Sequence, residues 1–357
     1  MTLAYERPAG RGGWGTIVAG ERSIPVRQAV LIGGAAIWLG QMLIATGAAG
    51  VTALWTNLYF LGVLLLLTAG TLTIGLRWVA FFFLAGGFAM ALMFPIGAVL
   101  DAIELFSGAT NTAIVFPITE EVLKILPVVG LLWWARRAGA WSLGASDVLL
   151  MAAAAGAGFG LLEDAYIRRD FGWPDQLAWL PVTEIIGGQM IAGHGIWSAI
   201  AGAAIGLALL LRSRGRGLAL LVGASGFVVA VLDHVRNNYG NRADDLPAQL
   251  LQTIGLDGWL AIYLFVGLVA AVIAADAWVI HRSRPRPPEH TFPPRPAGRA
   301  GWLQQWHFLL KRRELAFANF QFHRTDGADR EHVRQMASRL DFFLGMTAAP
   351  EANDEGQ

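Results

Sequence analysis

Long apolar runs alternate with short polar breaks along most of the chain. Each run is long enough to cross the ~30 Å hydrocarbon core of a bilayer, and only helices satisfy their own backbone hydrogen bonds over such lengths in lipid. The pattern therefore predicts an all-α, polytopic membrane protein with about eight transmembrane helices. The predicted spans lie near 28–50, 57–76, 78–100, 113–135, 143–167, 185–211, 217–235 and 257–280.

The composition supports this interpretation. Charged residues make up 15% of the 357 positions, whereas soluble domains average about 25%. The apolar runs exclude a soluble globular fold for residues 28–280, and they exclude intrinsic disorder there as well. The absence of cysteine excludes disulfides, thiolate metal sites and cysteine nucleophiles. The first run has no clear small-residue cleavage site, so we expect a retained span rather than a signal peptide.

Five segments follow from the distribution of apolar and charged positions. Residues 1–27 are expected to form a cytoplasmic N-terminal segment, and residues 28–280 the transmembrane domain. Residues 281–300 are rich in arginine and proline and predict a stiff linker. Helical spacing of apolar residues on both sides of a Thr-Asp-Gly turn predicts a small cytoplasmic helical hairpin over 301–345. A disordered tail is expected over 346–357.

The arginines in the connections between the runs indicate the orientation. With the N terminus inside, thirteen arginines lie on the inner face and four on the outer face. Positive charge is retained on the cytoplasmic side of membrane proteins. Both termini are therefore expected to be cytoplasmic.

Ionisable groups occur inside four of the predicted spans. Each costs at least ~2.5–3.5 kcal/mol near the bilayer centre on insertion scales, so each needs an explanation. Counting 1.5 Å per residue puts these groups in the outer half of the bilayer, from about 2 Å deep for His234 to roughly 14 Å for His194. The depths predict one shared site. The groups are Glu120-Glu121-x-x-Lys124, Glu163-Asp164, His194 followed by Trp197-Ser198, and Asp233-His234 with Asn238 one turn later.

Each group also has a purely structural interpretation. Glu120 and Lys124 are four residues apart and can form an ion pair that stabilises one helix. Glu163 and Asp164 can mark a helix end, His194 can hydrogen-bond between helices, and His234 can be solvated. Asp147 and Asp276 lie near inner helix ends, where a structural role is favoured.

As a set, the same groups indicate hydrolytic chemistry. The carboxylate pair Glu120 and Glu121 can act as a general base. Glu163, His194 and His234 match the ligand set of an open catalytic zinc site. No helix carries the His-Glu-x-x-His pattern, so the spacing of the histidines is not that of a typical zinc protease.

These motifs resemble, in order and each on its own helix, those of the PrsW family of intramembrane proteases, distant relatives of the CAAX prenyl proteases and bacteriocin-processing enzymes. The resemblance covers roughly residues 113–240. It implies a bacterial plasma-membrane peptidase whose best-known relative cleaves a membrane-bound anti-sigma factor outside the cytoplasm. It assigns function to Glu120, Glu121 and His234, with Glu163 and His194 as partners. Asp164 departs from the asparagine that the family often has.

Together these observations predict an intramembrane endopeptidase that acts near the outer face. Glu120 or Glu121 would deprotonate a water molecule, Lys124 would supply a compensating charge, and Asn238 would orient the substrate or help to form an oxyanion site. Zinc at Glu163, His194 and His234 is expected to assist, and a metal-free glutamate mechanism remains open.

The expected partners are the lipid bilayer and a membrane-anchored protein such as an anti-sigma-like factor, with no nucleic acid. Two other functions use the same sequence features. A proton- or cation-coupled transporter would use the buried charges as a relay, and a non-enzymatic scaffold would recruit partners through the tail. The substrate, the cleavage position and the oligomeric state are left open.

The orientation can be tested with reporter fusions. Reporters fused after residues 110 and 245 should report the outer face, and reporters fused after residues 140 and 285 should report the cytoplasm. A cytoplasmic signal from the fusion at residue 110 would invert the topology and move the site to the other leaflet.

Overall fold

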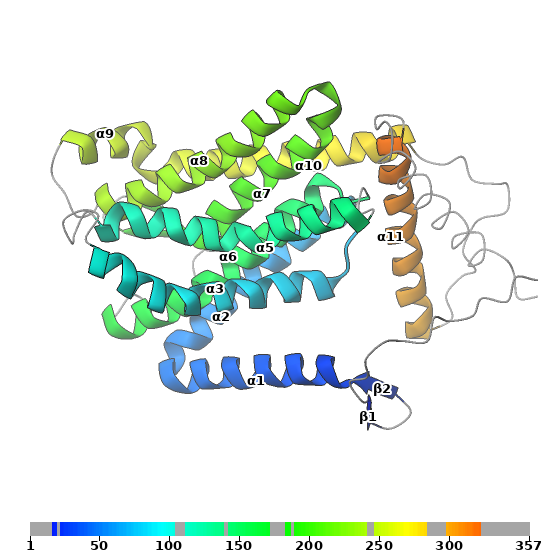
Figure 1. The fold of residues 1–357 in the computed structure, drawn as a ribbon, viewed down its shortest axis with the longest axis horizontal. Coiled ribbons are helices and arrows are strands. Elements are labelled where there is room, and N and C mark those ends of the chain that lie inside the picture. Colours follow the sequence, from blue (N-terminus) through cyan, green and yellow to red (C-terminus); the bar gives the residue numbers. More distant parts are fainter. Residues whose placement is uncertain are drawn as a thin grey trace, which may run out of the picture.

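The computed structural model describes residues 16–19, 22–103, 111–138, 142–171, 183–186, 189–240, 246–283 and 298–322. Long helices form most of this part of the chain, and two short antiparallel hairpins accompany them (Figure 1). The helices are α1 Val26–Thr46, α2 Ala48–Thr68, α3 Leu76–Ile103, α5 Phe116–Ala138, α6 Ala145–Phe171, α7 His194–Leu211, α8 Arg216–Gly240, α9 Leu246–Ile254, α10 Trp259–Ser283 and α11 Gly298–Phe322, with a π-helical turn at Asn111–Val115. The strands are β1 Thr16–Ala19, β2 Arg22–Pro25, β3 Thr183–Ile186 and β4 Gln189–Ala192.

The all-α, polytopic membrane architecture predicted from the sequence is confirmed. Within the described residues, six helices are long and apolar enough to cross a membrane: α2, α3, α6, α7, α8 and α10. The predicted number of eight is not confirmed. α5 is outside the six because it carries three charged residues within two turns. In α1, the apolar helical stretch Gly33–Thr46 is shorter than the six spans.

Helix α6 is the centre of the bundle. All of its apolar window is buried, whereas about a third of the α3 window and 28% of the α10 window are buried. Its sequence between Met151 and Gly160 is almost entirely alanine and glycine, and small residues let helix backbones approach closely in a membrane. A Cβ atom added to Gly158 would overlap the carbonyl oxygen of Phe83 on α3, and one added to Gly86 would overlap that of Ala155. The backbones of α3 and α6 are therefore in direct contact.

The predicted span at 185–211 is only partly helical. Strands β3 and β4 pair as an antiparallel hairpin, and α7 begins at His194 with Gly193 as its N-cap residue. Two glycines, Gly187 and Gly188, separate the strands in the sequence, and glycine pairs are typical of two-residue hairpin turns. His194 is therefore the first residue of a helix. The depth predicted for His194 was counted along a continuous helix over 185–211, and the hairpin interrupts that helix.

Asp147 and Asp276 stabilise the start of α6, at the end of the bundle opposite to the start of α7. Asp276 accepts hydrogen bonds from the backbone N–H groups of Ala145 and Ser146, at 2.9 and 2.6 Å. Asp147 accepts from Thr73, through its N–H at 2.8 Å and its hydroxyl at 2.6 Å, and also from the N–H groups of Ile74 and Gly144. Both carboxylates satisfy backbone donors that would otherwise be buried without partners, which agrees with the structural role favoured from the sequence.

Helix α11 runs across the end of the bundle where α6 begins and α10 ends (Figure 1). Phe317 is fully buried and lies against Gly144, and Phe320 packs edge-on against Trp278 of α10. The guanidinium of Arg313 donates to the carbonyl oxygens of Ala69 and Leu72, at 2.7 and 3.1 Å. This first part of the predicted hairpin is thus packed on the transmembrane domain, while the second part lies outside the described residues.

Candidate active site

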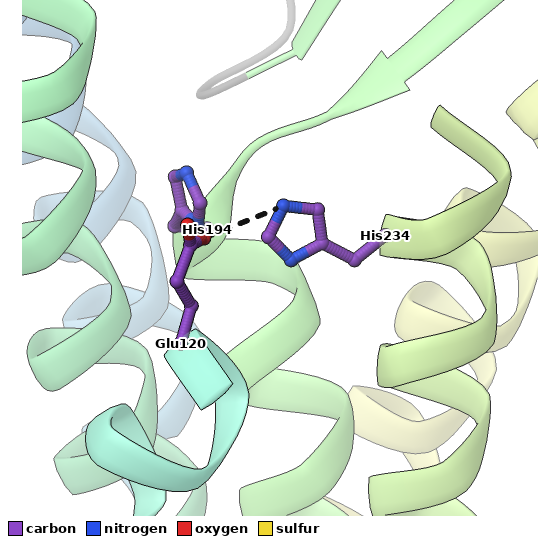
Figure 2. A group of neighbouring side chains, drawn as sticks. All are labelled: Glu120, His194 and His234. Atoms are coloured by element: carbon purple, nitrogen blue, oxygen red, sulfur yellow. Dashed lines mark ion pairs between the residues drawn. The ribbon is translucent and has the colours of Figure 1, made fainter. Parts of the chain in front are cut away.

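Four helices bring their ionisable side chains to one end of the bundle. Glu120, Glu121 and Lys124 lie near the start of α5, Glu163 near the end of α6, His194 at the start of α7, and His234 near the end of α8. Because successive helices alternate in direction, these positions fall at the same end, opposite to α11. Figure 2 shows Glu120, His194 and His234 pointing toward one another. The structure therefore brings these predicted residues together in one cluster.

Lys124 is the fully buried cation of this cluster. Its ammonium group donates to Oε1 of Glu121 and lies 2.7 Å from Nδ1 of His194. An ammonium group can only donate, so Nδ1 of His194 is the acceptor in this contact. The ammonium also lies 4.9 Å from the centroid of the Phe159 ring, within the range of a cation–π interaction. Lys124 thus pairs with Glu121 at i, i+3, rather than with Glu120 at i, i+4.

His234 is held in one orientation by Glu121. Nδ1 of His234 lies 2.9 Å from Oε1 of Glu121, and since a carboxylate oxygen accepts, Nδ1 carries the proton. The neutral ring then presents the lone pair of Nε2, which faces Oε2 of Glu120 at 3.6 Å. Oε2 of Glu120 is buried and has no hydrogen-bond partner among the described residues. Two acceptors face each other here, an arrangement that a proton, a water molecule or a cation between them would satisfy.

His194 lies between Glu163 and Lys124 and contacts both. Its Nε2 lies 2.5 Å from Oε2 of Glu163, and its Nδ1 faces Lys124. Next to Glu163, Asp164 accepts a hydrogen bond at 3.2 Å from the side chain of Asn57, a fully buried residue of α2. Asp164, which stands where the family often has asparagine, is thus hydrogen-bonded to α2 through the side-chain amide of Asn57.

Further contacts hold the ring of His234 and the hairpin that precedes His194. Trp197 stacks on His234 with ring centroids 4.0 Å apart, and its indole N–H donates to Asp233 at 2.8 Å. Asp233 also accepts from Nε of Arg236 at 2.8 Å. Arg236 is almost fully buried and donates to the carbonyl of Met190 on β4. The hairpin that leads into His194 is therefore tied to the helix that carries His234.

Close packing of α6 and α7 sets the position of His194. A Cβ atom added to Gly156 would overlap the carbonyl oxygen of His194, and one added to Gly160 would lie 3.3 Å from the Cβ atom of His194. These glycines are four residues apart on α6 and form the small-residue contact that lets helices approach closely in membranes.

The structure joins six of the seven predicted site residues in one network of contacts. Asn238 lies one turn beyond His234 and is half-buried, and its side-chain carbonyl accepts from Asn237 at 3.2 Å. Sequence reasoning gave no role to Asn57. Trp197 and Asp233 lie within the motifs but had no predicted role, and Arg236 lies two residues after His234. A buried asparagine within an apolar run was the available signal for Asn57.

The cluster also has the composition of a metal site. One ligand atom each from Glu120, His194 and His234 lie within 4.8 Å of one another. Two imidazole nitrogens and a carboxylate oxygen are ligands that zinc prefers. Glu120, Glu121 and Glu163 lie in the cluster with one lysine, and among the described residues Oε2 of Glu120 has no hydrogen-bond partner. The donor set and the excess of negative charge both fit a divalent cation. The carboxylate in this group is Glu120, whereas the sequence hypothesis named Glu163.

The profile of PrsW family intramembrane metalloproteases matches residues 75–274, more than half of the chain. This chain belongs to the PrsW family. The matched PrsW region extends from the start of α3 into α10 and contains every residue of the cluster. No match was found among curated proteins or among solved structures. Membership of the PrsW family, together with the apolar helices, makes the chain a multi-pass membrane protein of a peptidase family.

The contact of α6 with α7 can be tested by adding one methyl group. Gly156→Ala should lower the free energy of unfolding by about 1–3 kcal/mol, because the new Cβ atom has to displace the backbone at His194. Gly130→Ala on α5 is the matched control, since no atom lies within 4 Å of its added Cβ atom. Thermal unfolding of the purified proteins in detergent measures both. Equal transition temperatures for the two variants would contradict the direct backbone contact.

Proposed function

We propose that this chain is an endopeptidase that hydrolyses membrane-anchored proteins near the outer face of the bacterial plasma membrane. The observation that carries the proposal is the unpaired Oε2 of Glu120, which faces Nε2 of His234 inside a buried polar network. A buried carboxylate beside an oriented imidazole can bind and deprotonate water, and the family is one of peptidases.

Glu120 is the general base in the proposed reaction. A water molecule between Glu120 and His234 donates one hydrogen to each, and its oxygen attacks the carbonyl carbon of the scissile peptide bond. Its proton passes to Oε2 of Glu120 as the tetrahedral intermediate forms. Glu120 then gives this proton to the peptide nitrogen, the C–N bond breaks, and a carboxylic acid and an amine are released.

The neighbouring residues hold this arrangement. Glu121 accepts the Nδ1 proton of His234, which keeps the lone pair of Nε2 directed at the water. Lys124 neutralises the charge of Glu121, so that Glu121 does not compete with Glu120 for the proton. Asn238 is proposed to orient the substrate or to donate to the oxyanion, as the resemblance to the family implies.

A divalent metal ion, zinc by the chemistry of its donors, fits the same cluster. Glu120, His194 and His234 would hold it, and a bound zinc ion lets water lose a proton near neutral pH. Both ring nitrogens of His194 have protein partners, Lys124 and Glu163, so an ion would have to replace one of them. The metal-free glutamate mechanism needs no such replacement.

The peptidase activity can be tested by co-expression with tagged single-pass membrane proteins. Glu120→Gln should reduce the rate of cleavage by at least ~100-fold, because the amide cannot take up the proton from water. Asp170→Asn is the matched control, since Asp170 is an exposed carboxylate at the same end of the bundle, paired with Arg169. Identical fragments from wild type and Glu120→Gln would count against the protease. Cation or proton uptake by vesicles without any cleavage would favour the transporter.

The metal can be tested by elemental analysis, separately from activity. If zinc binds at the proposed residues, the purified protein should contain about one zinc per chain, and His194→Ala/His234→Ala should lose it. Glu120→Gln and Glu163→Gln then distinguish the carboxylate of the structural group from the one named from the sequence. Full cleavage activity in zinc-free protein would leave the glutamate mechanism alone.

A further inference from the structure

A cavity is also found at the end of the bundle opposite to the carboxylate cluster. It measures about 420 Å³ and opens where the connection of α2 to α3, the end of α5, the start of α6 and α11 meet. Its volume falls within the range of small-molecule sites in proteins. None of the residues of the proposed active site lines it.

Part of the lining of the cavity is charged. Arg77 and Lys311 contribute two cations to its lining, and Glu314 contributes one anion. Nζ of Lys311 donates to both carboxylate oxygens of Glu314, at 2.9 and 2.7 Å. Burial raises the pKa of Glu314, and the charges of Lys311 and Arg77 partly offset this effect. With Glu314 ionised, the three groups leave one positive charge.

Other lining residues of the cavity are apolar and aromatic. Leu76 and Trp134 line it and are also exposed on the outside of the bundle, at 67% and 58% of their surface. Trp78 lines it from the first turn of α3. Tryptophan is enriched where the hydrocarbon meets the lipid head groups. The cavity thus joins the apolar perimeter of the bundle to a charged pocket beneath α11.

We propose that this cavity binds the head group of an anionic phospholipid. The single phosphodiester charge would be matched by the net positive charge of Arg77, Lys311 and Glu314, and the acyl chains would leave along Leu76 and Trp134. Basic pockets between transmembrane helices on the cytoplasmic side are known to bind anionic head groups. Because α11 supplies part of the lining, a bound lipid would also stabilise the contact of α11 with the transmembrane domain.

The full chain, purified in a neutral detergent, provides the test. Short-chain phosphatidylglycerol should bind, as measured by native mass spectrometry, and should raise the unfolding temperature, because it binds the folded state. Phosphatidylcholine of the same chain length should do neither. Inorganic phosphate is the third probe and separates a lipid site from a plain anion site.

Charge-changing variants locate the binding. Arg77→Gln should weaken the binding of phosphatidylglycerol by about tenfold, whereas Arg216→Gln, an exposed arginine at the same end of the bundle, should leave it unchanged. Glu314→Gln removes the negative charge and should strengthen binding, which keeps the test decisive even if Arg77→Gln does not fold. Equal binding of both lipids, equal binding by Arg77→Gln and wild type, or binding of inorganic phosphate alone would overturn the proposal.

Discussion

Direct contact of helix backbones on α6 is the constraint on which the rest of the structure depends. Lipid tails are as apolar as leucine, so association of helices in a membrane relies on close packing and on hydrogen bonds between them. Gly158 lets α3 reach the backbone of α6, and Gly156 does the same for α7. A central helix with larger residues would move these neighbours outward, and His194 would then be too far from Glu163 for their contact.

The same packing makes a buried polar cluster tolerable. Isolated charges are costly at membrane depth, but here Lys124 neutralises Glu121 and His194 lies between Lys124 and Glu163. Among the described residues, the network leaves one oxygen of Glu120 without a partner, and this oxygen faces the lone pair of His234. Both proposed mechanisms use this position, since a water proton and a metal ion each satisfy two facing acceptors. The chemistry thus depends on which groups the network leaves unsatisfied.

The two ends of the bundle are stabilised by different means. At the end that contains the cluster, Arg236 connects α8 to strand β4 and, through Gln252, to α9. At the other end, Asp147 and Asp276 accept backbone hydrogen bonds at the start of α6, and the buried ring of Phe317 on α11 lies against Gly144. The proposed lipid site lies at this second end, so a bound lipid would act on the stability of α11 without touching the carboxylate cluster.

The sequence by itself determined the helical class, most helix positions and the end of the bundle at which the ionisable groups meet. Apolar length and alternation of direction decide these features, and both are local properties of the chain. It also indicated the PrsW family, because four ordered motifs lie on four helices. Tertiary structure alone decided the start of α7 at His194, the pairing of Lys124 with Glu121, the contact of Asn57 with Asp164 and the docking of α11. Each of these depends on groups outside the helix concerned: Lys124 also contacts His194 on α7, and a hairpin precedes α7. Helical periodicity shows which face a residue occupies but not what packs against it.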